Sequence, residues 1–333
     1  MKKKLIVWVG VAISALFLYW ALKGLHLKDV YQNLLHARYW WLVPGIAVYF
    51  VAVGLRTWRW HYLLRKIKKV PVSRLFPVVT IGYMGNNIYV ARAGELLRAY
   101  VLKRNEGISI SASLATIIVE RIFDGLVMLL FVFLTLPFVP MPSNLQKLVV
   151  FASFLFLGAL LLFFAIAMSP DWTQRNYRKY LLPRLPGKLG HSVDGLVERF
   201  LTGLHSLRSP MDLVMIFFTS VLVWLAETVK YWFVMHAFPF SVPFYVLMLM
   251  NGIVNLATTI PSSPGYIGTF DLPGIEVLAT FGVPRVIATA YTLVLHAALW
   301  LPITSLGAYY MWREQLNWGK IQADLAQDES RTA

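Results

Sequence analysis

The chain runs Gly85-Asn86-Asn87-Ile88-Tyr89-Val90-Ala91-Arg92-Ala93-Gly94-Glu95-Leu96-Leu97-Arg98 at a point where an apolar segment ends and ionisable side chains begin. The apolar segment, residues 76–90, is shorter than the ~20 residues that a helix needs to cross a bilayer. Basic residues flank it on both sides, which places both of its ends at the cytoplasmic face. The pattern therefore predicts a re-entrant hairpin over about residues 76–105, whose backbone is buried in protein or lines a cavity.

A second interrupted segment runs Pro261-Ser262-Ser263-Pro264-Gly265-Tyr266-Ile267-Gly268-Thr269-Phe270-Asp271 and separates two short apolar pieces. It predicts a second re-entrant hairpin, about residues 244–283, that enters from the opposite side of the membrane. Asn87 and Asn255 lie shortly before the glycine-containing breaks of the two hairpins. Interrupted hydrophobic segments in matching halves are typical of transporter sites, so we predict an inverted repeat with both hairpins meeting near the midplane.

The composition settles the class of protein. Hydrophobic residues make up 58% of the 333 residues and charged residues 14%, and the mean hydropathy is +0.61. A soluble domain of this length cannot bury so much apolar surface, so the chain is predicted to be an all-α polytopic membrane protein. The net charge of +15 gathers in a few loops, which indicates cytoplasmic loops and not a nucleic-acid surface. The absence of cysteine excludes disulfides and thiolate chemistry.

Six full transmembrane helices are expected, at about residues 5–22, 40–58, 110–138, 148–168, 212–237 and 286–312. Lys2-Lys3-Lys4 precedes the first one, and no Ala-x-Ala cleavage site follows it. A retained helix is therefore expected there, and not a signal peptide. Residues 25–38 have helical apolar spacing with polar residues between, which predicts a helix lying on the outer surface.

Basic residues concentrate in two stretches, which the positive-inside rule assigns to the cytoplasm. The first contains Arg56, Arg59, Arg65, Lys66, Lys68, Lys69 and Arg74, and the second is the loop 169–210. Both termini are accordingly expected in the cytoplasm. We expect a single transmembrane domain, residues 1–313, followed by a cytoplasmic tail, residues 314–333.

Three charged residues lie inside the expected third full span. Glu120 and Asp124 are one helical turn apart and share a face, and Arg121 is three residues from Asp124. Each unpaired charge at mid-membrane costs about 2.5–3.5 kcal/mol on insertion scales. We therefore expect Arg121 to pair with both carboxylates, so that its removal would strand them. One interpretation is a salt bridge that anchors the first hairpin, and the other adds contact with substrate.

The tip of the first hairpin carries Arg92, Glu95 and Arg98 at spacings of three. An arginine grips phosphate through a planar fork, Gly94 permits close approach of the backbone, and the helix start favours an anion. A plain positive-inside loop is the alternative, although such a loop has no need of Glu95. Asn86 and Asn87 either cap broken helix ends or contact substrate.

In the second hairpin, Pro264, Gly265 and Gly268 are expected to interrupt the helix and to release backbone groups for binding. Asp271 follows the break, where it caps, pairs or titrates, and His296 stands alone in an apolar span. The two either form a proton-sensitive carboxylate–imidazole pair or are a cap and a packed core residue. Glu227 and Lys230 are one turn apart and are interpreted as an internal ion pair.

Catalytic patterns are absent from the sequence. It contains no His-Glu-x-x-His, Gly-x-Ser-x-Gly, P-loop or dinucleotide fingerprint, and its seven histidines show no metal-ligand spacing. No catalytic residue, no metal and no cofactor are therefore predicted.

The two hairpins resemble a known family. Asn87 through Arg98, with Ala112-Ser113-Leu114-Ala115-Thr116 leading into Glu120-Arg121-x-x-Asp124, looks like the first signature of the lysylphosphatidylglycerol synthase transmembrane-region family, also called flippase-like domains. Pro261 through Phe270, followed by Phe281-Gly282-Val283-Pro284 and His296, looks like the second. The similarity covers about residues 5–313. The chain departs from the family at Val90, where proline is usual, and at Asp271, where glutamate is frequent.

The resemblance implies a bacterial or archaeal cytoplasmic-membrane protein that moves a lipid between leaflets, without the soluble domain that attaches lysine to phosphatidylglycerol. The cargo stays open among aminoacylated phospholipids, polyprenyl-linked sugars and hopanoids. We expect Arg92, Arg98 and Arg121 to hold the head-group phosphate, while Glu95, Glu120 and Asp124 orient them.

Two alternatives to a lipid flippase or scramblase remain. One is an intramembrane lipid-modifying transferase, and the other is a non-transporting membrane partner of a separate synthase or glycosyltransferase. The expected partners are membrane lipids with anionic phosphate head groups and no nucleic acid, with a homo-oligomer left open.

Overall fold

The computed structural model describes residues 2–89, 93–140, 143–168, 175, 210–260 and 263–316. Within these ranges the chain is helical and contains no strand. The α-helices are α1 (Lys2–Leu22), α2 (Leu27–Leu35), α3 (Leu42–Leu64), α4 (Val72–Ile88), α5 (Ala93–Glu106), α6 (Ile110–Thr135), α7 (Ser143–Met168), α10 (Pro210–Met235), α11 (Phe244–Ala257), α12 (Asp271–Thr280) and α13 (Arg285–Arg313). Three short 3-10 helices are η1 (Tyr39–Trp41), η2 (Leu136–Phe138) and η5 (Pro264–Tyr266).

Three described helices are long and apolar enough to cross a membrane, namely Tyr39–Leu64, Met211–Met235 and Arg285–Arg313. Shorter apolar helices occur at Val11–Leu22, Gln146–Leu162 and Phe244–Ala257. The chain is therefore a helical membrane protein, as its composition predicts. The prediction of six full spans stays a prediction, and the loop 169–210 and the residues after 316 lie outside the described ranges, apart from Arg175 and the start of α10.

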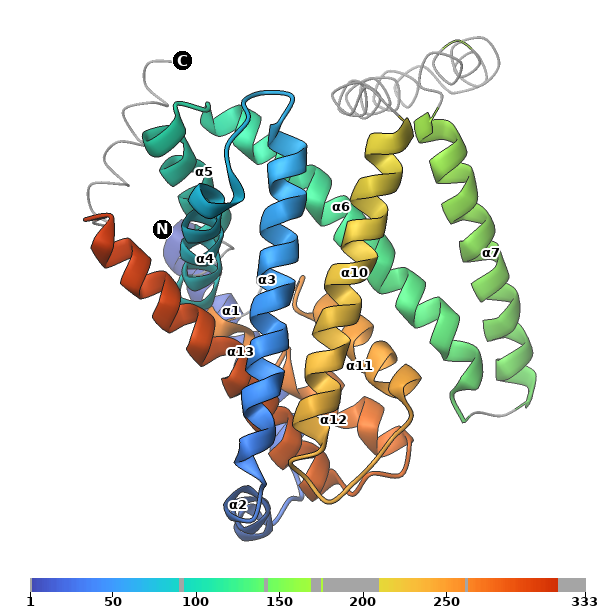
Figure 1. Cartoon of the computed structure of the whole chain (residues 1–333). Coiled ribbons are helices and arrows are strands. Elements are labelled where there is room, and N and C mark those ends of the chain that lie inside the picture. Colours follow the sequence, from blue (N-terminus) through green and yellow to red (C-terminus); the bar gives the residue numbers. More distant parts are fainter. Residues whose placement is uncertain are drawn as a thin grey trace.

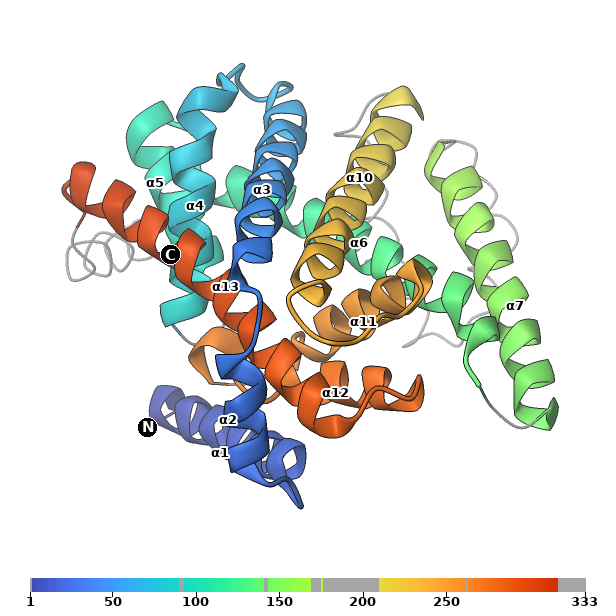
Figure 2. The ribbon, with the colours of Figure 1, turned by 60° about the horizontal axis from the view of Figure 1, so that its bottom comes forward.

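The long helices α3 and α10 lie side by side at the centre of the molecule (Figure 1). The pair α4–α5 packs against α13 on one flank, and α6 crosses behind α3 and α10 before it turns into α7 at the other edge. Seen from below, α11 and α12 lie between α13 and α6, and α1 packs on the outside of α12 (Figure 2). This arrangement surrounds the ends of α4 and α11 with helices on all sides.

The pair α4–α5 forms a tight helical hairpin because three glycines allow the two backbones to touch. A Cβ atom on Gly94 would lie 1.9 Å from the carbonyl oxygen of Gly82, and one on Gly85 would lie 2.7 Å from the Cα of Gly94. No side chain fits at this crossing. The predicted limits, 76–105, fall slightly inside the observed ones, and the tip residues 90–92 lie outside the described ranges.

The second hairpin consists of α11, η5 and α12. Gly265 and Gly268 have φ values of +73° and +81°, a left-handed backbone that favours glycine. The hydroxyl of Ser14 in α1 donates to Ser263 Oγ at 2.8 Å and accepts from the Ser263 N–H at 2.9 Å. The first helix thus packs against the break in the second hairpin and closes it from outside.

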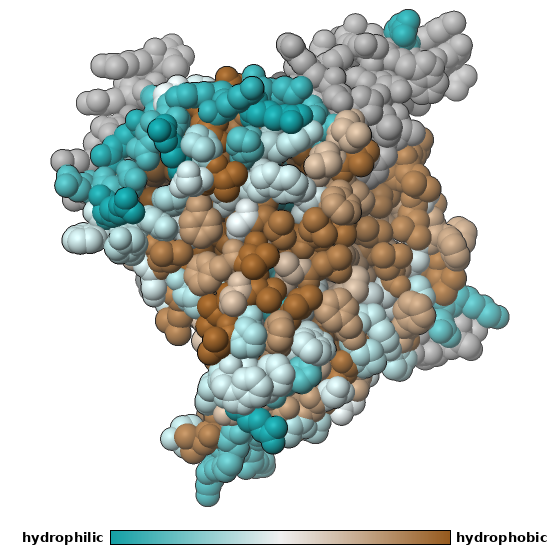
Figure 3. All heavy atoms as spheres, viewed as in Figure 1, coloured by the Kyte–Doolittle hydropathy of each residue, from teal (hydrophilic) through white to brown (hydrophobic). Residues whose placement is uncertain are grey.

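The surface separates into an apolar belt between polar ends (Figure 3). The exposed large apolar side chains of α7 and α10 include Phe154 and Phe218, and the lower polar end coincides with α2. Arg56 and Arg59 belong to the basic cluster that was expected at the cytoplasmic end of the second span. Both lie within α3, with 7% and 1% of their surface exposed, because they face the interior of the helix bundle.

Candidate functional site

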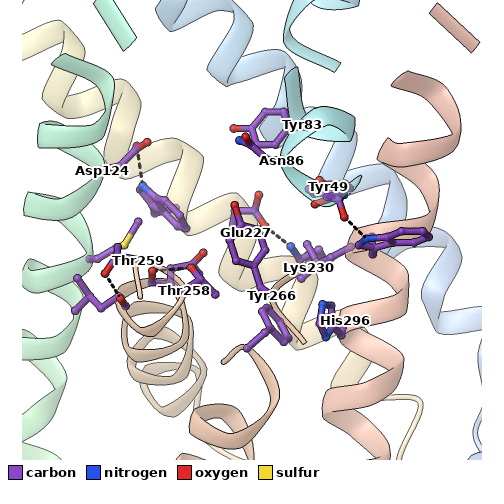
Figure 4. A pocket seen from close by; sticks show the side chains of 18 of the residues that line it. Tyr49, Tyr83, Asn86, Asp124, Glu227, Lys230, Thr258, Thr259, Tyr266 and His296 are labelled. Atoms are coloured by element: carbon purple, nitrogen blue, oxygen red, sulfur yellow. Dashed lines mark hydrogen bonds and ion pairs between the residues drawn. The ribbon is translucent and has the colours of Figure 1, made fainter. Parts of the chain in front are cut away.

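A cavity of about 250 Å³ lies where α3, α4, α6, α10, α11, η5 and α13 converge (Figure 4). The predicted site residues that line it are Asn86, Asn87, Arg121, Asp124, Asn255, Gly265 and His296. Gly94, Glu95 and Arg98 instead line a smaller pocket of about 20 Å³, which shares Asn86 and Arg121 with the cavity. Neither lining includes Glu120, Pro264, Gly268 or Asp271, and Arg92 lies outside the described residues.

Asp124 accepts from three side chains that come from two other helices and its own. Arg59 donates to both of its oxygens, at 2.7 and 3.2 Å, and Trp224 Nε1 donates to Oδ1 at 3.0 Å. Arg121 Nη2 lies 3.1 Å from Oδ2. Asp124 is 1% exposed, so its charge needs a partner inside the protein. Arg59 is the main partner, because it binds both carboxylate oxygens, whereas Arg121 contacts one.

Glu120 pairs with a different helix. Arg98 Nη1 donates to Glu120 Oε2 at 2.7 Å, and the guanidinium of Arg98 lies 3.5 Å from the centre of the Trp60 ring. Trp60 Nε1 in turn donates to Thr116 Oγ1 at 3.0 Å. These contacts tie α5 to α6 and α3, which explains how the first hairpin is held.

The expectation that Arg121 pairs with both carboxylates holds for Asp124 and not for Glu120, which pairs with Arg98 and Arg59. Arg121 is 34% exposed in its side chain, lines the cavity, and lies 3.8 Å from Glu95 Oε1 through its Nε. Glu120 and Asp124 have their own arginines on α5 and α3. Spacing on α6 accounts for the pair of Arg121 with Asp124, and the partners of Glu120 come from α5 and α3.

A second charged cluster spans α3 and α10, and we call Arg56, Glu227 and Lys230 the triad. Arg56 Nη1 donates to Glu227 Oε1 at 2.5 Å, and Lys230 Nζ donates to Glu227 Oε2. All three are buried, with Lys230 only 1% exposed. Figure 4 shows Glu227 and Lys230 at the centre of the cavity, with Tyr49 beside them.

The sequence did not predict that the triad belongs to the functional site. The pair Glu227–Lys230 was expected as an internal ion pair, and the structure does contain that contact, but it lies in the cavity wall together with Arg56. The signal that identifies Arg56 and Arg59 is their place three residues apart on the face of α3 that also buries Tyr49, Trp60 and Leu63. Positive-inside reasoning, applied to the charge alone, overlooks this periodicity.

The end of α4 and the 3-10 helix η5 meet at the cavity, beside α13. Trp300 Nε1 on α13 donates to the carbonyl of Asn87 at 3.4 Å, and a Cβ on Gly265 would lie 2.9 Å from the same nitrogen. Asn87 Nδ2 donates to Thr304 Oγ1 at 2.8 Å, so its side chain does not cap α4 but links it to α13. Asn86 Oδ1 is buried and finds no hydrogen-bond partner among the described residues.

Asp271 and His296 lie against each other below this contact. His296 Nδ1 is 2.9 Å from Asp271 Oδ1, and its Nε2 is 2.7 Å from the carbonyl of Gly265. Asp271 Oδ2 also accepts from the Gly268 N–H at 2.8 Å. Both ring nitrogens lie within hydrogen-bonding distance of an oxygen, so the imidazole is held at both sides. The pair fixes the shape of the second break.

Asn255 lines the cavity at the end of α11, where its Nδ2 donates to Asn251 Oδ1 at 2.7 Å. Asn251 continues this chain to Thr228 Oγ1 of α10 at 3.0 Å. Across the described ranges, no group of three or more His, Asp or Glu is placed to hold a metal ion. The site is thus an assembly of charged and amide groups in an apolar protein.

Comparison with known proteins groups this chain with membrane proteins. A UPF0104 membrane protein of Methanothermobacter thermautotrophicus is 25% identical over 287 residues, which are 81% of this chain and 83% of that protein. A UPF0104 membrane protein of Pyrococcus horikoshii is 23% identical over 92% of this chain and 96% of its own length. The glycosyltransferase AglD of Haloferax volcanii is 24% identical over 80% of this chain, a match that spans 47% of AglD.

The family model described as lysylphosphatidylglycerol synthase TM region matches residues 7–307. This range includes both hairpins, the charged helix α6 and every helix that lines the cavity. By this match, the chain belongs to the lysylphosphatidylglycerol synthase TM region family.

Proposed function

We propose that this protein is a lipid flippase or scramblase that moves a phosphate-containing lipid between the leaflets of a bacterial or archaeal cytoplasmic membrane. The observation that carries the proposal is the cavity, where two hairpin tips and the charged side chains of three helices converge inside an apolar protein. Charged groups inside a membrane protein are costly and typically mark a substrate pathway. A polar cavity of this kind shelters a head group while its tails stay in the bilayer.

The size of the cavity supports a head group as its occupant. A volume of about 250 Å³ lies just below the range of about 300–1,000 Å³ that holds drug-sized ligands. A head group fits such a space, and a whole lipid does not. In this proposal α4–α5 and α11–α12 are re-entrant hairpins of an inverted repeat, the termini are cytoplasmic, and an aminoacyl-phospholipid or a polyprenyl-linked glycolipid is the cargo.

The roles of individual residues in the proposal follow their places in the structure. Three arginines, Arg92, Arg98 and Arg121, were expected to hold the head-group phosphate. Of these, Arg121 borders the cavity and is placed to contact a head group there. Arg98 is buried against Glu120 and Trp60, so it anchors the hairpin. Arg92 keeps its proposed contact with phosphate as a hypothesis from sequence. The protein changes the leaflet of its lipid and not its chemical identity.

One observation favours a second function. The glycosyltransferase AglD matches this chain over 47% of its length, so the region that AglD shares with this chain is joined there to further sequence. A non-transporting membrane partner of a separate synthase or glycosyltransferase is therefore the second candidate. Such a partner changes the product of its enzyme, whereas a flippase alone changes leaflet accessibility.

A proteoliposome assay tests the proposal. Purified protein is reconstituted with a fluorescent phosphatidylglycerol, and a membrane-impermeant quencher then reports the share of probe in the outer leaflet. Wild type should expose nearly all of the probe, and lipid mass spectrometry should find it unaltered. Exposure of half of the probe, as in protein-free vesicles, contradicts the proposal.

Two glycines supply a matched pair of variants for this assay. Gly125 lines the cavity and Gly158 lies on α7, and neither would bring a Cβ within 4 Å of another atom. Gly125→Phe should fill the cavity and slow exchange at least tenfold, while Gly158→Phe should leave it unchanged. Equal rates in both variants would show that lipid does not pass through the cavity.

A further inference from the structure

The charges of the described residues around the cavity do not balance. Among these residues, five cationic side chains are joined by ion pairs to four carboxylates: Arg56, Arg59, Arg98, Arg121 and Lys230 against Glu95, Glu120, Asp124 and Glu227. Within this set, three arginines on α3, α5 and α6 face three carboxylates. The excess of one positive charge lies in the triad, where Arg56 and Lys230 share Glu227.

The pair of His296 and Asp271 does not cancel this excess. A doubly protonated ring beside the Asp271 carboxylate, or a neutral ring beside a protonated Asp271, satisfies both contacts of His296, and either arrangement leaves the pair without net charge. Aromatic rings also flank Lys230 of the triad. Lys230 Nζ lies 4.7 Å from the centre of the Tyr49 ring and 5.2 Å from that of Tyr231.

The triad has hydrogen-bond capacity left for an anion. An ammonium has three donors, and Glu227 is the acceptor that the structure gives to Lys230. Arg56 Nε is buried and donates to no described group, although Arg56 lines the cavity. A buried cation with unfilled donors is costly unless a partner is supplied. An anion in the cavity supplies that partner for both side chains.

We infer that Arg56 and Lys230 form the phosphate-binding site of the cavity and that the site takes a phosphodiester head group with a single negative charge. One excess positive charge is matched by one phosphodiester, whereas a phosphomonoester brings a second charge at neutral pH and above. Glu227 sets this preference, since it removes one of the two positive charges. The inference relies on the proposed function only for a lipid as the carrier of the phosphate.

The test measures binding and not transport. Purified protein in detergent is incubated at about pH 8 with phosphatidylglycerol, a phosphodiester, or with phosphatidic acid, a phosphomonoester, and native mass spectrometry counts the retained lipid. Lys230→Met and Arg56→Gln each leave a neutral ion pair behind, so the fold is expected to persist. Each should lower retention of phosphatidylglycerol roughly tenfold or more, the worth of a charge-assisted hydrogen bond.

Two further variants sharpen the test. Lys147→Met removes an exposed lysine of α7 outside the cavity and should bind as wild type does. Glu227→Gln raises the excess to two positive charges and should shift retention from phosphatidylglycerol toward phosphatidic acid. Undiminished phosphatidylglycerol retention in Lys230→Met and Arg56→Gln, or no shift in Glu227→Gln, would overturn the assignment.

Two comparisons complete the test. The first distinguishes a lipid phosphate from a soluble phosphate, and the second distinguishes failure of the binding site from failure of the flippase proposal. Millimolar inorganic phosphate should not displace phosphatidylglycerol, and displacement would assign the site to a soluble anion. If wild type binds phosphatidylglycerol at the triad but does not exchange it between leaflets, the flippase proposal fails and the site stands. If Lys230→Met exchanges and binds lipid as wild type does, the site fails and the flippase proposal stands.

Discussion

At the scale of single residues, the two arginines that bind Asp124 differ in their burial, since the side chain of Arg59 is 1% exposed and that of Arg121 is 34% exposed. Arg59→Ala should lower the free energy of unfolding by about 3–5 kcal/mol, because it leaves the buried carboxylate of Asp124 without its bidentate partner. Arg121→Ala should cost about 1 kcal/mol or less, since Arg121 is partly exposed and Arg59 still holds Asp124. Thermal unfolding followed by tryptophan fluorescence compares them. Equal losses would contradict the observed pairing.

Glu106 provides a prediction for pH at the polar end of the molecule. Hydrogen bonds from Lys68 and Arg74 lower the pKa of the Glu106 carboxyl below its ordinary value of 4.5, the one from Lys68 most strongly. A carboxyl whose pKa is lowered by folding stabilises the fold above its unfolded pKa, and that contribution disappears as pH falls through the folded pKa.

Glu106→Gln should accordingly lower the melting temperature at pH 7, by an amount that corresponds to at most about 1 kcal/mol because its partners are exposed. The difference between variant and wild type should shrink below about pH 4.5. Melting curves from pH 3 to 7, about one pH unit apart, measure it. A difference that is constant down to the lowest pH would show that the ion pairs contribute nothing.

At the scale of elements, the second hairpin depends on one side chain of α13. His296 contacts both Asp271 and the carbonyl of Gly265, so these two contacts hold the break in α11–α12 in place. If the hairpin tip moves during transport, the rate of lipid exchange should vary between about pH 5.5 and 8, where histidines change charge.

His296→Gln and Asp271→Asn should each flatten this pH profile, because neither variant retains a carboxylate–imidazole pair. The exchange assay in proteoliposomes measures it, with His36→Gln on the exposed helix α2 as the control that keeps the wild-type profile. Profiles that match wild type in both hairpin variants would reduce Asp271 and His296 to fixed structural contacts, and exchange would then be independent of protons.

At the scale of the whole molecule, the polar ends of the apolar belt predict the orientation in the membrane. The end that carries Lys66, Lys68 and Lys69 should face the cytoplasm, and the start of α7 should face outward. The chain has no cysteine, so Lys69→Cys and Gln146→Cys each introduce a single exposed thiol. A membrane-impermeant maleimide should label Gln146→Cys in intact cells and Lys69→Cys only after lysis. Labelling of both from outside would contradict this topology.

The sequence by itself determined the class, the family and the places of the helical breaks. These features are local properties of the sequence. The length of an apolar run and its basic flanks indicate where a helix can lie in a membrane, and the glycines at 85, 94, 265 and 268 indicate where helices break or pack closely. The predicted spans 110–138, 212–237 and 286–312 accordingly agree with α6, α10 and α13 to within three residues. The close approach of Gly82, Gly85 and Gly94 shows why these positions carry no side chain.

Only the tertiary structure decided which charges pair and which face the cavity. Arg59 binds a carboxylate 65 residues away, and Arg56 binds one 171 residues away, so no local spacing connects them. Charge counting along the chain grouped both arginines with a cytoplasmic basic cluster, and spacing on α6 assigned Arg121 to both Glu120 and Asp124. A buried charge takes whichever partner lies nearest in space, because in a low dielectric an unpaired ion is too costly to keep. Helix packing, and not position in the sequence, sets that choice.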